Sequence, residues 1–265
     1  MSSVANTSDT SCVRASASTS AFSLAGRVIL VTGASSGIGE ATARMCAELG
    51  AKLVLNGRDA ERLNAVYVAL AGIGHVVIAG DLSLGETREA LVEAVPAYDG
   101  LASCAGVAAL VPLRMANEAH LQKMLAVNYL APITLTQRLL YKKRINQDAS
   151  LVYVTALSAN AAPQAAAGYA ASKAALEAAS RTLALEQAKF RIRSNCVAPG
   201  YVETPMLHSL GSQTSMEGKI DLTPLGRLTP ADVAASICFL LSGASRWITR
   251  STLTVDGGLG IPMRI

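Results

Sequence analysis

The chain has 265 residues, of which 51% are hydrophobic and 16% are charged, and its formal net charge is +4. This length suits one large α/β domain, and the apolar share is enough for a large core. The charge is small and scattered, which argues against a nucleic-acid partner. Since no apolar run reaches the roughly 20 residues of a membrane-spanning helix, we expect no membrane partner either.

The five cysteines are odd in number and lack the spacing of metal ligands; they are Cys12, Cys46, Cys104, Cys196 and Cys238. We therefore expect reduced thiols, a cytoplasmic protein and no metal site. Residues 1–22 are rich in serine, threonine and alanine and have no apolar core of a signal peptide. They predict a flexible N-terminal tail, followed by one catalytic domain over residues 23–265.

The first predicted element is a buried parallel strand at residues 26–32, an apolar run bounded by glycine. A glycine-rich turn follows it directly, and a helix-forming run covers residues 40–49. A strand, a glycine turn and a helix in this order bring backbone N–H groups and a helix N-terminus to a pyrophosphate. The turn therefore predicts a dinucleotide site made by Gly33, Ser35, Ser36, Gly37, Ile38 and Gly39.

The second predicted strand, at residues 52–56, ends at Gly57 and Arg58. Enzymes that use NAD usually place an acidic residue here to bind the ribose 2′-hydroxyl, whereas an arginine accommodates a 2′-phosphate. Arg58 therefore favours NADP(H) over NAD, unless it only solvates the loop beside Asp59. A third strand, at residues 75–79, leads to Asp81 and Leu82. At a strand end, Asp81 is expected to face the ligand crevice, and a helix-capping role is compatible with that.

The remaining segments continue the alternation of strands and helices. Strands are predicted near residues 101–106, 150–155, 193–198 and 252–258, and helices at 120–127, 129–143, from Tyr169 to about 189, and 232–241. Residues 205–222 have no regular pattern and are expected to form a mobile lid. This alternation predicts a single Rossmann-like, doubly wound parallel sheet with helices on both faces.

Tyr169 and Lys173 are four residues apart in a predicted helix, so they project from the same face. An ammonium group beside a phenol favours the phenolate and should lower the pKa of the tyrosine. Such a tyrosine is the proton donor or acceptor that carbonyl reduction needs.

Together, these motifs resemble the short-chain dehydrogenase/reductase family from about residue 24 to residue 260. Within that family the sequence is most similar to the branch of 3-oxoacyl-(acyl-carrier-protein) reductases. The segments that carry the resemblance are residues 32–39, Asp81-Leu82, Cys104-Ala105-Gly106, Asn128, Tyr169 to Lys173, Pro199 to Thr204, Pro224 to Arg227 with Asp232-Val233, and Val255 to Gly258.

The resemblance implies an oxidoreductase that moves a hydride between nicotinamide and a ketone, a secondary alcohol or an acyl thioester. Tyr169 would exchange the proton, Lys173 would hold the nicotinamide ribose, and Asn128 would hold a water of a proton relay. Asp81 and Leu82 would contact the adenine and Ala105 and Gly106 its ribose, with Pro199, Gly200, Val202 and Thr204 near the carboxamide. The family also implies a homotetramer or a dimer.

One departure from the family pattern concerns a serine thirteen residues before the tyrosine, which polarises the substrate carbonyl. Here that position is Ala156. Three readings are open: Ser158 serves instead if the following loop is two residues shorter than usual, Thr155 rotates in, or the donor is missing. Ser158 is our candidate. The third reading would suit the alternative function, a catalytically impaired or non-catalytic dinucleotide-binding protein.

A second departure is Arg250, which occupies a position where the family usually has glycine. Glycine at such a position often has a positive φ angle. We therefore expect a modified turn before the last strand.

Overall fold

The structure is a computed structural model that describes residues 20–210, 218 and 220–260. Among them, seven strands form one sheet in the order β3-β2-β1-β4-β5-β6-β7, and every neighbouring pair is parallel. The strands are β1 Val28–Thr32, β2 Lys52–Gly57, β3 Val76–Ala79, β4 Tyr98–Ser103, β5 Ile145–Val154, β6 Arg193–Pro199 and β7 Thr252–Val255. The predicted single doubly wound sheet is confirmed.

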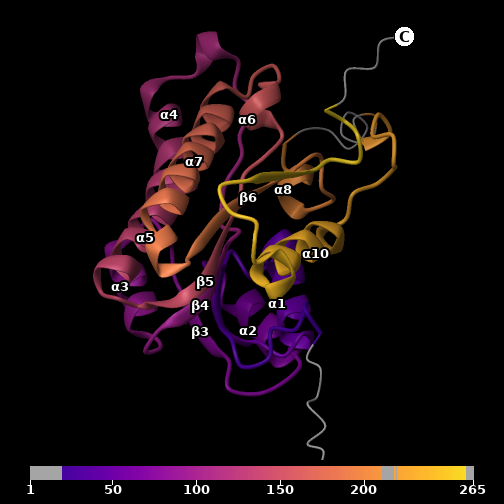
Figure 1. Ribbon diagram of the computed structural model, residues 1–265. Coiled ribbons are helices and arrows are strands. Elements are labelled where there is room, and N and C mark those ends of the chain that lie inside the picture. The colour runs from indigo at the N-terminus through magenta and orange to yellow at the C-terminus, as the bar shows by residue number, and fades with distance from the viewer. Residues whose placement is uncertain (1–19, 211–217, 219, 261–265) are drawn as a thin grey trace, which may run out of the picture.

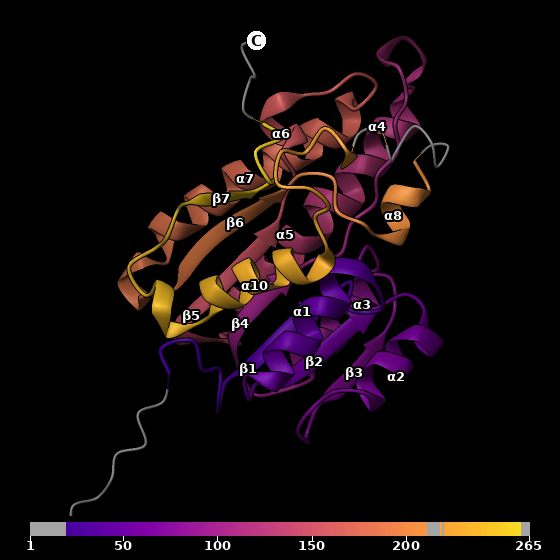
Figure 2. The ribbon, with the colours of Figure 1, turned by 90° about the vertical axis from the view of Figure 1, so that its right-hand side faces the viewer.

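Helices cover both faces of this sheet (Figures 1 and 2). One face carries α1 (Gly37–Glu48), α2 (Ala60–Val68) and α10 (Pro230–Leu241), and the other carries α3 (Gly85–Glu93), α5 (Ala131–Tyr141) and α7 (Ala167–Glu186). The helices α4 (Glu118–Leu125), α6 (Ser158–Ala161) and α8 (Pro205–His208) lie towards the carboxyl ends of the strands, at the top of Figure 1.

Two buried apolar clusters, one on each side of the sheet, hold these layers together. In β1, Ile29 and Val31 point to the cluster under α1 and α10, and Leu30 points to the cluster under α5 and α7. This alternation follows from the two-residue repeat of a strand whose two faces are both covered. Because both faces are buried, the register is fixed, and the strand ends meet along one edge.

Three local features differ from the sequence-based expectation. Residues 126–130 form a π-helical turn between α4 and α5, so Asn128 does not open the second helix. Such turns are set by the local packing and are common at functional sites. Strand β4 starts at Tyr98 rather than residue 101. Gly100 lies within it and packs under Leu241, where a Cβ at residue 100 would lie 3.0 Å from the leucine Cδ2.

The segment from residue 205 onwards is partly helical, since Pro205–His208 form α8. The predicted lid over 205–222 also includes residues 211–217 and 219, which lie outside the described residues, as does most of the predicted tail. Ala21, near the end of that tail, accepts a hydrogen bond from the Ala244 amide, 2.8 Å away. Within the described part of the chain, no helix is long and apolar enough to cross a membrane.

The described cysteines are free thiols. Cys46 of α1 and Cys238 of α10 lie with their sulfurs 3.5 Å apart in the core. Cys12 is outside the described residues.

Arg250 has a φ of 62°, in the left-handed region that favours glycine. Its amide donates to the Ser194 carbonyl at 2.8 Å, and this bond holds the turn that leads into β7. The modified turn expected from the sequence is therefore a glycine-type turn that an arginine adopts at some energetic cost.

This strain predicts a stabilising substitution. A left-handed residue other than glycine costs about 1–2 kcal/mol, whereas glycine loses about 0.5–1 kcal/mol more entropy on folding. Arg250→Gly should therefore raise the free energy of unfolding by about 0.5–1 kcal/mol, measured by urea denaturation. Arg246→Gly is the matched control, because Arg246 is also exposed but has a φ of −56°. It should lower stability, and equal effects of the two substitutions would contradict the argument.

Candidate active site

The glycine turn after β1 forms a cradle with no room for side chains. Gly33 and Gly37 have φ angles of 67° and 55°, and a Cβ at Gly39 would lie 2.1 Å from the Gly33 carbonyl oxygen. Ser36 precedes α1 in an extended conformation and makes no side-chain hydrogen bond to the helix N-terminus. The first N–H groups of α1 are thus open to an anion, and the cradle fits a pyrophosphate.

A cavity of about 340 Å³ opens in front of this turn, at the carboxyl ends of β1 to β4. It includes all six turn residues predicted from the sequence. The other predicted cofactor residues in it are Arg58, Asp81, Leu82, Ala105, Gly106 and Thr204. Asn56, Asp59 and Arg62 also line it, and the sequence analysis did not include them. Arg62 could have been found, because it lies in the first turn of the helix that starts two residues after Arg58.

The position of the usual acidic residue is tightly packed. A Cβ on Gly57 would lie 3.0 Å from the Ser35 Oγ and 3.3 Å from a Leu63 methyl carbon. Asp59 pairs with Arg62, 3.2 Å away, rather than with Arg58. Among the described residues Arg58 makes no hydrogen bond or ion pair, which leaves its guanidinium free at the cavity.

Asp81 lies at the rim of the same cavity. Its Oδ1 accepts bonds from the hydroxyl and the amide of Ser83, at 2.7 Å and 2.8 Å. These bonds hold the pKa of the Asp81 carboxyl below its usual value, with a smaller contribution from Arg58. Asp81 thus closes the turn before α3, while Leu84 precedes the helix itself.

A second cavity, of about 710 Å³, continues from the first at the carboxyl ends of β4 to β6. The two cavities share six lining residues: Ile38, Cys104, Gly106, Val107, Thr204 and Met206. Besides the shared Ile38 and Gly106, seven predicted site residues line the second cavity, namely Ser158, Tyr169, Lys173, Pro199, Gly200, Val202 and Thr204. The structure therefore brings the residues from both halves of the sequence to one continuous cleft.

Tyr169 and Lys173 lie on one face of α7, as their spacing predicts. The Lys173 Nζ is 5.8 Å from the centre of the Tyr169 ring, and it donates a 2.8 Å hydrogen bond to the Val154 carbonyl at the end of β5. Gly106 closes the other side, since a Cβ there would lie 3.4 Å from Nζ. The lysine is thus buried between β5, α7 and the loop after β4.

Burial dominates the pKa values of this pair. It raises the pKa of Tyr169 to about 12 and lowers the pKa of Lys173 to about 8. The expectation that the ammonium lowers the pKa of Tyr169 is therefore wrong for this structure. The physical reason is that a buried phenolate loses its hydration, and an ammonium 5.8 Å from the ring centre does not offset that loss.

Asn128 is the one predicted site residue that lines neither cavity. It is buried in the π-helical turn, where its Oδ1 accepts from the Val107 amide at 2.8 Å. Its Nδ2 donates to the Val107 carbonyl at 2.9 Å and to the Ser172 hydroxyl at 3.0 Å. Asn128 therefore fixes the loop that carries Gly106 and Val107 against α7. Its role in holding a water stays a prediction.

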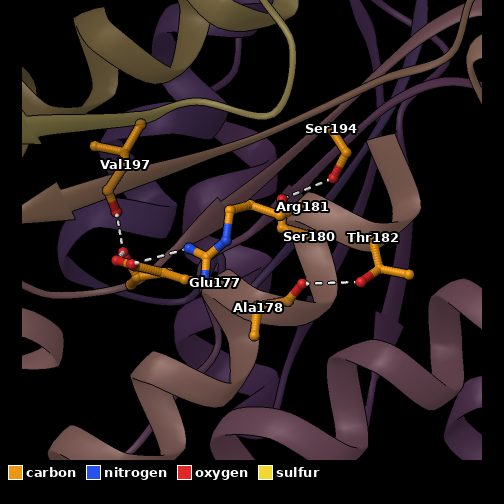
Figure 3. A network of polar contacts seen from close by, with 8 residues as sticks. Glu177, Ala178, Ser180, Arg181, Thr182, Ser194 and Val197 are labelled. Atoms are coloured by element: carbon orange, nitrogen blue, oxygen red, sulfur yellow. Dashed lines mark hydrogen bonds and ion pairs between the residues drawn. The ribbon is translucent and has the colours of Figure 1, made fainter. Parts of the chain in front are cut away.

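The candidates for the missing serine hydroxyl have different surroundings in the structure. Ala156 lines the second cavity without a hydroxyl. Thr155 is buried, and its Oγ1 donates to the Glu177 carboxylate at 3.0 Å, with the Val197 carbonyl at 3.2 Å. Figure 3 shows Glu177 on α7 beside Arg181, close to Val197 of β6. Sequence reasoning missed Glu177, a buried carboxylate that follows Lys173 by one turn.

No group of three or more potential metal ligands is found in the described part of the chain.

Comparisons with known proteins agree with this geometry. A family model described as enoyl-(acyl carrier protein) reductase matches residues 33–260. A galactitol 2-dehydrogenase (L-tagatose-forming) from Cereibacter sphaeroides is 34% identical over 245 residues, which cover 89% of this chain and 96% of that protein. A 3-oxoacyl-(acyl-carrier-protein) reductase from Rickettsia prowazekii is 31% identical over 238 residues, covering 89% of this chain and 98% of that protein.

A solved structure gives the same result in three dimensions. A short-chain dehydrogenase/reductase from Brucella melitensis, titled glucose/ribitol dehydrogenase, superposes with a TM-score of 0.83 at 32% identity. The match covers 89% of this chain and 97% of that structure.

The buried Lys173 predicts a pH dependence of stability. Its pKa falls from the ordinary value of 10.5 to about 8, so between these values the unfolded chain binds one proton more than the folded chain. The contribution of Lys173 to the free energy of unfolding therefore rises with pH, by about 1.4 kcal/mol per pH unit. From about pH 8 to about pH 9.5, wild type should gain about 1–2 kcal/mol relative to Lys173→Met in urea denaturation. A difference that does not change with pH would refute this.

Proposed function

We propose, from the premise that the chain belongs to the short-chain dehydrogenase/reductase family, that it reduces ketones with NADPH and oxidises secondary alcohols with NADP⁺. Oxidoreductase activity on CH–OH groups follows from the family. The cofactor, the substrate class and the roles of individual residues are the proposal.

The observation that carries this proposal is that Tyr169 and Lys173 line the second cavity, which shares Gly106 and five other residues with the first. The first cavity offers the glycine cradle for a pyrophosphate, and the second offers space for a substrate. Because the cavities share six residues, a dinucleotide that extends from the first reaches the phenol in the second. When bound, such a cofactor supplies the hydride that the carbonyl carbon accepts.

The lining residues support a role for each part of the chain. The turn from Gly33 to Gly39 would bind the pyrophosphate through its backbone, and Asp81 and Leu82 would contact the adenine. Ala105 and Gly106 would contact the adenine-side ribose. Pro199, Gly200, Val202 and Thr204 would lie at the carboxamide.

Tyr169 would act as the acid in reduction. With a pKa of about 12, its phenol holds its proton at neutral pH and can give it to the carbonyl oxygen as the carbonyl carbon gains a hydride. The products are a secondary alcohol and a tyrosinate that regains a proton from solvent. The Lys173 ammonium would stabilise the tyrosinate while it exists and hold the nicotinamide ribose.

The region around Arg58 supports NADP(H). Position 57 carries no acidic side chain and is tightly packed, and the free guanidinium of Arg58 suits a 2′-phosphate. Arg62 lines the same cavity and adds positive charge, although Asp59 offsets part of it.

The second cavity supports an uncharged and largely apolar substrate. Among its described lining residues, Lys173 is the one charged side chain, while leucine and alanine are frequent. A cationic substrate would lose its hydration there without a partner, and an anionic one would find only the Lys173 ammonium, which already donates to the Val154 carbonyl. We therefore favour a bulky ketone, or the acyl part of a thioester, over a sugar acid.

We also propose a homotetramer or a dimer, as the family resemblance implies. Helix α7 is rich in alanine, which allows close contact with another helix. Ala170 packs inside the chain, whereas Ala171 and Ala178 are exposed and open to a second subunit. Leu185, on the same helix, is 62% exposed.

Tyr169→Phe tests the proposed function directly. The variant should lose ketone reduction by at least about 10²-fold in kcat while binding NADPH as wild type does, because only the transferable proton is removed. NADPH fluorescence measures binding, and NADPH absorbance with a panel of bulky ketones and 3-oxoacyl thioesters measures turnover. Tyr141→Phe is the control, since Tyr141 is 71% exposed on α5 and should leave kcat unchanged.

Two outcomes would contradict the proposal. One is turnover by Tyr169→Phe at the wild-type rate. The other is a wild-type protein that binds NADPH and turns over no ketone or alcohol. The second outcome would favour the alternative of a non-catalytic dinucleotide-binding protein, to which Ala156 points.

Arg58→Asp tests the cofactor preference. Loss of a charge-assisted bond to the 2′-phosphate, worth about 1.5–3 kcal/mol, should weaken NADPH binding by about 10- to 100-fold. The ratio of the dissociation constants for NADPH and NADH should rise accordingly. Fluorescence titration with both cofactors gives the dissociation constants. Arg246→Asp makes the same charge change at an exposed position outside both cavities. An unchanged ratio for Arg58→Asp would remove the basis for NADP(H).

A further inference from the structure

We infer that Ser158 supplies the hydroxyl that polarises the substrate carbonyl, in place of the serine that position 156 lacks. This inference rests on the proposed function. It identifies a catalytic residue displaced by two positions along the chain, from the end of β5 to the first residue of α6.

The hydroxyl of Ser158 has no structural task in the described chain. Its Oγ is buried, and it has no hydrogen-bond partner. A buried hydroxyl without a partner costs about 1–3 kcal/mol, and such groups are rare in folded proteins. An unpaired polar group beside a substrate cavity is therefore explained best by a partner that arrives with the substrate.

The position of Ser158 suits this role. It lines the second cavity together with Ala156 and Tyr169. Its Oγ is shielded from solvent in the present rotamer. No hydrogen bond holds that rotamer, so turning the hydroxyl towards the cavity by rotation about χ1 would break no bond.

The backbone explains why Ser158 cannot move into the place of residue 156. The Thr155 amide donates to the Val197 carbonyl at 2.8 Å, and the Leu157 amide donates to the Pro199 carbonyl at 2.9 Å. These two bonds fix the register of residues 155–157 against β6. The strand therefore does not shift by two residues to bring Ser158 to the place of residue 156, and the Ser158 hydroxyl must act from α6.

The neighbouring hydroxyls have other partners. Thr155 donates to Glu177 and lies within 3.2 Å of the Val197 carbonyl, and turning it towards the cavity would leave the buried Glu177 carboxylate with one donor fewer. Thr204 lies 3.3 Å from the Val202 carbonyl and accepts from the Leu207 amide at the start of α8. Of these three hydroxyls, only that of Ser158 can turn towards a substrate without breaking an existing hydrogen bond.

In the reaction, the Ser158 hydroxyl would donate a hydrogen bond to the carbonyl oxygen, and no covalent bond of the serine would form or break. Tyr169 would still transfer the proton to that oxygen. The serine bond would strengthen as negative charge develops there, which is how such donors accelerate reduction.

The test compares four variants by kcat for ketone reduction, the dissociation constant for NADPH and the melting temperature. Ser158→Ala should lower kcat by about 10²–10³-fold with NADPH binding unchanged. Its melting temperature should stay the same or rise, because an unpaired buried hydroxyl is removed. A residue with only a structural role would instead lower the melting temperature.

Two further variants exploit the vacant position of the usual serine. Ala156→Ser alone should change kcat by less than about threefold, since a donor is already present. The double variant Ala156→Ser/Ser158→Ala should have a kcat at least about tenfold higher than that of Ser158→Ala. Thr155→Val should lower the melting temperature and keep kcat within about threefold, because it removes the bond to Glu177.

Three results would overturn the inference. Ser158→Ala would retain more than about a third of wild-type kcat, or Ala156→Ser alone would raise kcat by more than about tenfold. The third result is a stable double variant whose kcat is no higher than that of Ser158→Ala. If Tyr169→Phe is inactive in the same assays, the proposed function stands in each of these cases. If Tyr169→Phe is active, the proposed function itself has failed.

Discussion

The buried ammonium of Lys173 is the interaction on which the rest of the site depends. Its 2.8 Å hydrogen bond to the Val154 carbonyl ties α7 to the end of β5. The same group lies against Gly106, where a Cβ would be 3.4 Å away. A desolvated ammonium is costly, and burial lowers its pKa to about 8. The chain tolerates this cost at the point where its two cavities join.

The architecture around this group is a set of close backbone approaches. Gly33 packs against Ala105 so closely that a Cβ at position 33 would lie 2.7 Å from the alanine amide nitrogen. Asn128 holds Val107 by two hydrogen bonds, of 2.8 Å and 2.9 Å. These contacts join the turns after β1 and β4 to α7. A dinucleotide cradle and an acid–base pair are thus parts of one packed unit rather than separate sites.

The departures from the family pattern show how the fold absorbs unusual residues. Arg250 takes a left-handed conformation and keeps the turn before β7. Ala156 leaves the cavity wall without a hydroxyl, and the unpaired Ser158 hydroxyl lies two residues further on. Strain and unpaired polar groups are tolerated where the surrounding backbone is held by many other bonds.

The sequence by itself determined the parallel sheet, the glycine turn and the shared helix face of Tyr169 and Lys173, because each follows from a local pattern or a fixed helical spacing. Only the tertiary structure decided the partners of Thr155 and Asn128, since Glu177 and Val107 are distant in sequence and meet them through packing. It also decided the π-helical turn at Asn128 and the protonated state of Tyr169, which burial controls. Spacing along a chain fixes which side chains share a face. It does not fix which of them lose water or find a partner across the core.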